Sequence, residues 1–115
     1  MITLFNKNYL TILFLISIVS TSLIYPQNEN KINKDDCTFK GFKLYGKIQF
    51  VDSFPDIKIQ IVDSFPDLEV KIVDSFADKC GEWQIVDSFP DLKVQIVDSF
   101  PDLKIKYVES FPGIP

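Results

Sequence analysis

Val51-Asp-Ser-Phe-Pro-Asp-Ile-Lys-Ile-Gln-Ile-Val-Asp-Ser-Phe-Pro-Asp67 contains two copies of one hexapeptide, with a short apolar segment between them. The hexapeptide Val-Asp-Ser-Phe-Pro-Asp occurs four times intact and twice in altered form, at spacings of 11, 11, 13, 11 and 11 residues. Such regular self-similarity determines the architecture of a chain, so it is interpreted before any local pattern. The intact copies are residues 51–56, 62–67, 86–91 and 97–102, and the altered copies are 73–78, with Ala77 for proline, and 108–113, with Glu109 and Gly113 for the aspartates.

The segments between the hexapeptides are predicted to be β-strands. Residues 57–61 read Ile-Lys-Ile-Gln-Ile, in which β-branched residues alternate with polar ones at period two. Ser-Phe-Pro-Asp is predicted to be the corner between strands, because proline fixes φ and aspartate forms local hydrogen bonds. Ile61 and Val62 are adjacent and both apolar, so either the chain bulges there or both faces of the strand are covered. The odd period of 11 presents the same choice, and both alternatives stay open.

The repeats fall into two blocks. Gly46-Lys-Ile-Gln-Phe50 aligns with Gly81-Glu-Trp-Gln-Ile85, and each segment begins a run of three strand-and-hexapeptide units. A duplicated three-unit block is the most economical interpretation. It predicts a small, single-domain, all-β fold of tandem 11-residue strand–turn repeats, with its two halves in a pseudo-twofold arrangement.

The composition argues against several classes of function. The 115 residues suffice for one small domain, and they include 12 lysines, no arginine, no histidine and 16 acidic residues. Without histidine the chain lacks the commonest general base, the usual zinc ligand and the physiological pH switch. The net charge of −4 argues against nucleic-acid binding, which requires a clustered basic surface.

Residues 1–27 are predicted to be a secretory signal peptide rather than part of the fold. Lys7 precedes an apolar run over residues 10–25, and serine and threonine at 20–22 supply small residues for cleavage. An uncleaved membrane anchor is the alternative, although the run is shorter than the roughly 20 residues that span a bilayer. Residues 28–36 are predicted to be a polar tail. This N-terminus predicts a secreted or periplasmic protein whose only membrane contact would be an uncleaved signal segment.

Several segments outside the hexapeptides make the pattern specific. They are the run from Cys37 to Gly46, the segment Lys79-Cys-Gly-Glu-Trp-Gln84, and the ending Glu109-Ser-Phe-Pro-Gly113. Together with the tandem hexapeptides they closely resemble the septoil knot domain family over residues 37–115. The resemblance implies a small all-β domain whose backbone forms a seven-crossing torus knot, which general rules on chain topology would not suggest. It implies no established activity, substrate or cofactor.

Cys37 and Cys80 are an even pair in a chain that is predicted to be exported, which favours a disulfide. The bridge would join the start of the domain to the junction between its halves, and it would contribute about 4 kcal/mol by the chain-entropy model. Two buried free thiols are the alternative. Two cysteines without histidine are too few ligands for a zinc site.

The aspartates of the hexapeptides form two registers that stacked repeats would align. Aligned carboxylates could bind calcium, although the glycine-rich spacing of calcium-binding β-rolls is absent. The alternative is that they hydrogen-bond the backbone at corners. Near-identical carboxylates single out no pair for glycoside hydrolysis. The first register is Asp52, Asp63, Asp74, Asp87 and Asp98, and the second is Asp56, Asp67, Asp78, Asp91 and Asp102.

One phenylalanine recurs in every hexapeptide. These rings could form a binding stripe for sugars or peptides, but a periodic aromatic in a small domain is predicted to be core, where each would contribute roughly 1.5–3 kcal/mol. Gly81, Glu82 and Trp83 are the least repetitive segment and are predicted to contact a partner. The predicted repeat core is Phe54, Phe65, Phe76, Phe89, Phe100 and Phe111.

These patterns predict a non-catalytic, exported binding or structural domain, with no catalytic, cofactor-binding or metal-binding residues. The expected partner is a protein or another envelope component, and the domain is expected to be monomeric and to use no cofactor. Three alternatives are kept: a calcium-binding β-repeat module, a secreted enzyme of unidentified type, and a fibril-forming protein. The serine of Val-Asp-Ser-Phe has no evident base to activate it, and the prolines and strand lysines oppose fibril formation.

Overall fold

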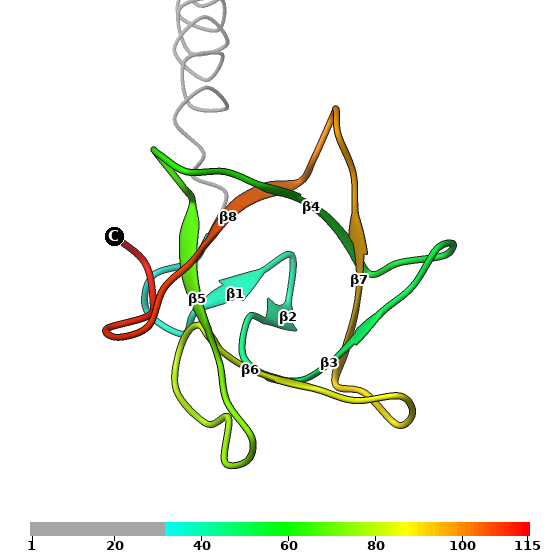
Figure 1. The fold of residues 1–115 in the computed structure, drawn as a ribbon, viewed down its shortest axis with the longest axis horizontal. Helices are drawn as coiled ribbons and strands as arrows, with labels where there is room; N and C mark the ends of the chain where they lie inside the picture. Colours follow the sequence, from blue (N-terminus) through cyan, green and yellow to red (C-terminus); the bar gives the residue numbers. More distant parts are fainter. Residues whose placement is uncertain (1–31) are drawn as a thin grey trace, which may run out of the picture. The chain divides into compact units, whose positions relative to one another are not determined.

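A computed structural model describes residues 32–115, which form an all-β domain without helices (Figure 1). The all-β prediction is confirmed, whereas the predicted signal peptide over residues 1–27 lies outside the described residues. Two short strands, β1 (Thr38–Phe39) and β2 (Phe42–Lys43), form an antiparallel hairpin. The six longer strands are β3 (Gly46–Phe50), β4 (Ile57–Ile61), β5 (Leu68–Ile72), β6 (Glu82–Ile85), β7 (Leu92–Ile96) and β8 (Leu103–Tyr107).

The six longer strands close into a barrel in the order β3-β6-β5-β8-β4-β7, and all their pairings are parallel. Each strand pairs with one neighbour through its first residues and with the other neighbour through its last. In β3, Gly46–Ile48 pair with β6 and Ile48–Phe50 pair with β7. This stagger tilts the strands against the barrel axis, and closure removes the exposed edges of the sheet.

The two halves are interleaved, so the predicted pseudo-twofold arrangement is wrong. Each strand of the first half lies between two strands of the second half. Equivalent strands are direct neighbours, with β3 beside β6, β4 beside β7 and β5 beside β8. A rotation by one strand position about the barrel axis therefore relates the halves, because all six strands run in the same direction.

Four of the six hexapeptides are crossover loops that pass over the outside of a strand from the other half (Figure 1). In loop 51–56 the Val51 amide donates to the Val94 carbonyl at 2.9 Å, and the Asp56 amide donates to the Lys93 carbonyl at 2.8 Å. Both carbonyls belong to β7, which lies between the strands that this loop connects. Loops 62–67, 86–91 and 97–102 cross β8, β3 and β4 in the same way. Segment 73–78 instead leads from β5 towards its direct neighbour β6, and segment 108–113 lies against β5 after the last strand.

These crossovers settle the two choices that the repeat period left open. Strand β4 ends at Ile61, and Val62 begins the next loop by donating its amide to the Ile105 carbonyl at 2.8 Å. Neither a bulge nor double-sided cover is needed there. The inward and outward alternation of side chains is interrupted by each loop and begins again at the first residue of the next strand. The odd repeat period therefore does not exchange the inner and outer faces from one unit to the next.

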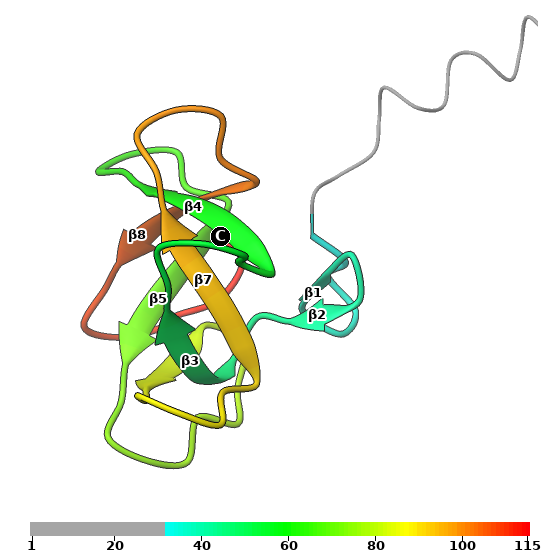
Figure 2. The same ribbon diagram turned by 90° about the vertical axis from the view of Figure 1, so that its right-hand side faces the viewer.

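The barrel interior is filled by the third residue of each five-residue strand and by the first residue of β4, β5, β7 and β8. In β6, which begins at Glu82, Trp83 takes the equivalent inward position, and its indole Nε1 donates to the Leu44 carbonyl at 3.0 Å. Hairpin residues pack against the same core and close the N-terminal end of the barrel (Figure 2). The fully buried strand residues are Ile48, Ile57, Ile59, Leu68, Val70, Trp83, Leu92, Val94, Leu103 and Ile105.

The ordered domain begins earlier than predicted. Ile32 is buried in the core cluster, and Asn33 and Thr38 exchange two backbone hydrogen bonds. The predicted tail over residues 28–36 is therefore wrong for residues 32–36, and residues 28–31 lie outside the described range. A single apolar side chain within a polar run was enough to fix this segment to the barrel.

Candidate functional site

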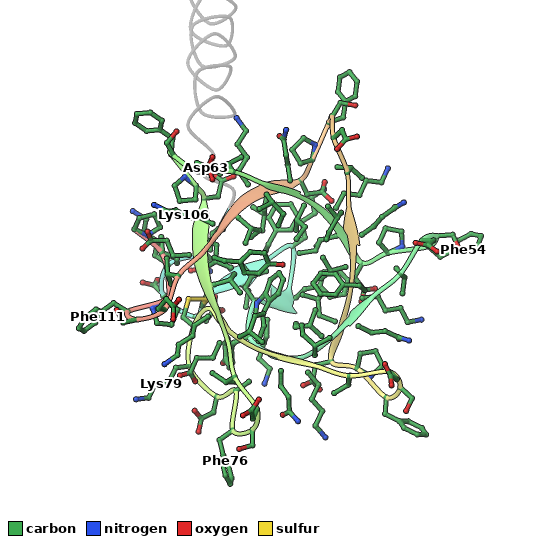
Figure 3. The ribbon with its side chains drawn as sticks, in the orientation of Figure 1. Phe54, Asp63, Phe76, Lys79, Lys106 and Phe111 are labelled. Carbon is green, nitrogen blue, oxygen red and sulfur yellow. A yellow bond between two sulfur atoms is a disulfide. The ribbon has the colours of Figure 1, made fainter. Side chains whose placement is uncertain are left out.

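The six hexapeptide phenylalanines lie at the tips of the crossover loops and are 84–92% exposed. The prediction that they form the core is wrong. Their position after serine, in the middle of each hexapeptide, places them outside the barrel, where the side chain cannot reach the interior. Phe54, Phe76 and Phe111 point away from the barrel in different directions (Figure 3). We call these six side chains, Phe54, Phe65, Phe76, Phe89, Phe100 and Phe111, the tip phenylalanines.

The backbone at every tip phenylalanine is left-handed, with φ between 53° and 56°. This conformation costs a bulky residue about 1–2 kcal/mol, whereas glycine adopts it without steric cost. Five of the six residues also precede proline, which favours extended backbone at that position. Neither packing nor backbone geometry within residues 32–115 therefore accounts for phenylalanine at the tips.

Four aspartates of the second register hold the loops onto the strands they cross. The Asp56 amide donates to the Lys93 carbonyl, and the Lys93 amide donates back to Asp56 Oδ2, each at 2.8 Å. This arrangement confirms that these carboxylates bind backbone at corners. The same reciprocal pair joins Asp67 with Lys104, Asp91 with Lys47, and Asp102 with Lys58.

The two altered hexapeptides lack this reciprocal pair. The Gly113 carbonyl accepts the Glu69 amide that an aspartate carboxylate would otherwise accept. In loop 73–78 the Asp78 amide donates to the Phe76 carbonyl instead. In the four crossings where an aspartate carboxylate accepts a strand amide, that amide belongs to a lysine. At the equivalent strand position beside the two altered hexapeptides, the residue is Glu69 or Glu82. Repeat variation thus follows the local electrostatics of each crossing.

The first register behaves differently, because its carboxylates are exposed and make no hydrogen bond or ion pair within residues 32–115. Three of its backbone carbonyls instead accept side-chain amides of neighbouring strands: Asp52 from Gln95, Asp87 from Gln49 and Asp98 from Gln60. No group of three or more acidic, histidine or cysteine side chains among the described residues is arranged to hold a metal ion.

A second apolar surface lies at the C-terminal end of the barrel. The last residue of each strand shares the inward face of the first and third residues, but it lies at the end of the barrel opposite the hairpin and is 37–51% exposed. The Phe50 ring packs 6.4 Å from the ring of the buried Trp83, which shows that this face points into the barrel. We call Phe50, Ile61, Ile72, Ile85, Ile96 and Tyr107 the mouth ring.

The predicted partner contact is wrong for Gly81 and Trp83, because both residues are buried. A Cβ at Gly81 would lie 2.5 Å from the Glu69 carbonyl oxygen, so only glycine fits against β5. Glu82 is partly buried, and its Oε1 accepts the Lys79 amide at 3.1 Å. The alignment of residues 46–50 with residues 81–85 already contained the signal for burial, since it places Trp83 at the position of the buried Ile48.

The predicted disulfide is confirmed. Cys37 and Cys80 are bonded, with Cα atoms 5.8 Å apart and a sequence separation of 43. The bond connects the hairpin to the junction between the halves, and it indicates an oxidising compartment outside the cytoplasm. A shallow depression of about 270 Å³ beside it is lined by Lys34, Asp36 and Tyr45, among others. Within residues 32–115, no helix of a length and hydropathy that could span a membrane is found.

These features define a small, disulfide-linked parallel β-barrel in which the two halves of the chain cross each other repeatedly. The chain belongs to the septoil knot domain family, since the model of the 7(1) septoil knot domain matches residues 41–115. The two halves alternate around the barrel and their loops cross each other's strands, which is the repeated winding that a torus knot requires. The resemblance in the sequence is thereby confirmed.

A protein of Synechocystis sp. (strain ATCC 27184 / PCC 6803 / Kazusa), described as uncharacterized, is similar to this chain. The two are 69% identical over 55 residues, which is 48% of this chain and 49% of that protein. The match thus spans about half the length of the curated relative.

Proposed function

We propose that this protein is a non-catalytic, exported binding module that contacts its partners through the tip phenylalanines. The observation that carries the proposal is their combination of 84–92% exposure with a left-handed backbone. A bulky side chain that is exposed and has a left-handed backbone lowers the free energy of unfolding, so the fold alone does not favour it. Exposed aromatic rings that make no intramolecular packing contribute most where they enter a partner's apolar pocket.

The polar residues support binding rather than catalysis. Catalysis requires a group whose surroundings differ from those of its neighbours, whereas aspartate, serine and lysine recur here in near-identical settings. The second-register carboxylates of Asp56, Asp67, Asp91 and Asp102 accept backbone amides, which favours the binding module over the calcium alternative. The Cys37–Cys80 disulfide and the apolar N-terminal segment support export.

The arrangement of the tips favours a repetitive or multiple partner. The labelled tips radiate from the barrel in different directions, so one flat surface cannot reach all six (Figure 3). Each tip is then a separate, weak site with one aromatic anchor. Linked weak sites gain affinity only when the partner presents several copies of the complementary group at a suitable spacing.

Site-specific photo-crosslinking tests this function. Benzoylphenylalanine replaces Phe54 or Phe100 in the native host, and Lys58, which is exposed on the barrel wall, is replaced as the control. We expect both tip positions to cross-link to the same envelope component after irradiation, with little or no product from position 58. Absence of any specific product from the tip positions in exported, folded protein would contradict the proposal.

A further inference from the structure

The mouth ring is surrounded by carboxylates. Each hexapeptide places an acidic residue two positions after a mouth-ring residue, within about 7 Å of backbone. Gln49, Gln60 and Gln95 bind three of the corresponding backbone carbonyls, which keeps the start of these loops beside the strand ends. Both altered hexapeptides keep this acid. We call Asp52, Asp63, Asp74, Asp87, Asp98 and Glu109 the acid rim.

The charge of the acid rim is only partly balanced by neighbouring lysines. Lys71 and Lys106 are the lysines next to the mouth ring on the barrel wall, so six carboxylates face two ammonium groups at this end. At the other end of the strands, four lysines stand beside the four aspartates that bind their backbone amides. The apolar end of the barrel is therefore also its most acidic end.

We propose that the mouth ring docks a polypeptide segment in which a bulky apolar side chain is flanked by lysine or arginine. The apolar side chain would cover Phe50 and the four mouth isoleucines, and the flanking cations would lie against the acid rim. This surface is separate from the tip phenylalanines, so the inference does not depend on the function proposed for them. Charge complementarity of this kind selects partners and speeds association.

A second copy of the chain is a poorer occupant for two reasons. Its mouth ring and its tip phenylalanines are themselves flanked by aspartates, so either contact would bring like charges together. The mouth ring also offers on the order of 500 Å² of apolar surface, taking roughly 200 Å² for a large side chain at two-fifths exposure. A standard protein interface needs about 800 Å² per partner, whereas a short segment needs less.

Isoleucine methyl NMR of the folded, disulfide-bonded domain tests the proposal. The probes are three blocked peptides, Lys-Lys-Leu-Lys-Lys, Lys-Lys-Ser-Lys-Lys and Glu-Glu-Leu-Glu-Glu, and zwitterionic phosphatidylcholine vesicles. We expect the basic leucine peptide to shift Ile61, Ile72, Ile85 and Ile96, with little change at the buried Ile57 and Ile59. The serine and acidic peptides should bind at least fivefold more weakly. Higher salt should also weaken the basic peptide, because exposed charges are screened.

Three variants locate the binding. Ile96→Lys, at the most exposed mouth position, should weaken binding at least tenfold while the interior methyl signals stay unchanged. The triple variant Asp52→Asn, Asp87→Asn, Asp98→Asn keeps the backbone carbonyls that bind glutamine, and it should weaken binding several-fold and flatten the salt dependence. Lys58→Gln, on the exposed barrel wall, should leave binding unchanged. Equal binding of all three peptides, equal shifts with the vesicles, or unchanged binding in Ile96→Lys would overturn the proposal.

Discussion

At the scale of single residues, the tip phenylalanines contribute little to the stability of the fold and are exposed on its surface. The backbone at these positions has a positive φ, which glycine and asparagine adopt more readily than phenylalanine, and the side chain is exposed to solvent. Every other large apolar residue between positions 32 and 115 is at most 51% exposed. A tip side chain can therefore be removed with a small effect on stability, which makes these residues suited to test binding alone.

Phe100→Gly should change the free energy of unfolding by no more than about 1 kcal/mol, because relief of left-handed strain offsets the greater freedom of glycine in the unfolded chain. Ile105→Ala, in the fully buried interior, should cost about 2–5 kcal/mol. Denaturant titration of both variants measures the difference. A loss in Phe100→Gly as large as that in Ile105→Ala would show that the ring stabilises the fold.

Asp98 and Asp102 belong to the same loop and provide a matched pair. Asp102 Oδ2 accepts the Lys58 amide at 2.8 Å, whereas the Asp98 carboxylate has no such partner. We expect Asp102→Ala to lower the free energy of unfolding by about 1–2 kcal/mol and Asp98→Ala by at most about 0.5 kcal/mol. Equal losses in the two variants would mean that the carboxylate–amide bond contributes nothing specific.

Tyr107 in the mouth ring makes the stability of the fold depend on pH. Partial burial raises the pKa of its phenol above the ordinary value near 10. The unfolded chain then loses the phenolic proton first, so this stability is full below about pH 10 and is lost as the pH rises through the higher folded-state pKa. Melting temperatures between pH 8 and 11 should fall less steeply for Tyr107→Phe. Parallel curves for the two proteins would contradict this assignment.

At the scale of elements, strand register depends on two glycines at the start of each half. Gly46 and Gly81 stand where the other strands begin with isoleucine or leucine. A Cβ at Gly46 would lie 2.6 Å from Asp91 Oδ2, and one at Gly81 would lie 2.5 Å from the Glu69 carbonyl oxygen. Crossing segments of the chain approach closely at these points and leave no space for a side chain.

Gly81→Ala should therefore destabilise the domain by more than about 2 kcal/mol, since it combines left-handed strain with backbone overlap. Gly41→Ala in the hairpin is the control, because its φ of 87° is also positive but no atom lies within 4 Å of the added Cβ. It should cost only about 1 kcal/mol, from strain alone. Thermal unfolding distinguishes the two. A Gly81→Ala variant as stable as Gly41→Ala would show that the crossing can open.

The strands could be predicted from sequence because their signal is local. Alternation and β-branching placed residues 57–61 correctly, and proline with aspartate marked the corners. The order of strands around the barrel could not be predicted, since a repeat does not say which unit lies beside which. The core prediction for the tip phenylalanines is wrong because a periodic aromatic in a small domain is usually buried, whereas Phe54 and its equivalents lie in predicted loops. The mouth ring could not be foreseen without knowing that the barrel is closed and that the hairpin covers the opposite end.

At the scale of the whole molecule, stability and topology are linked by the crossings. Two loops of the first half lie over β7 and β8, and two loops of the second half lie over β3 and β4, so neither half can complete its barrel surface alone. The Cys37–Cys80 disulfide then ties the hairpin to the junction between the halves. Such a fold cannot form by stacking finished units in sequence, unlike repeat proteins in which each unit contacts only its neighbours.

Refolding should therefore be slow, and its rate should depend on how long the reduced chain stays unfolded. Non-local strand pairing already slows folding to milliseconds or seconds in simple β domains, and the chain must also thread through itself. Brief exposure to denaturant leaves the winding in place and should permit fast refolding, whereas long exposure allows it to loosen and adds a slow phase. Interrupted-unfolding experiments on the reduced protein measure both phases.

Proline isomerisation also produces a delay-dependent slow phase, so prolyl isomerase is included to accelerate that component alone. A slow phase that resists the isomerase supports threading, and millisecond refolding after any delay would contradict it.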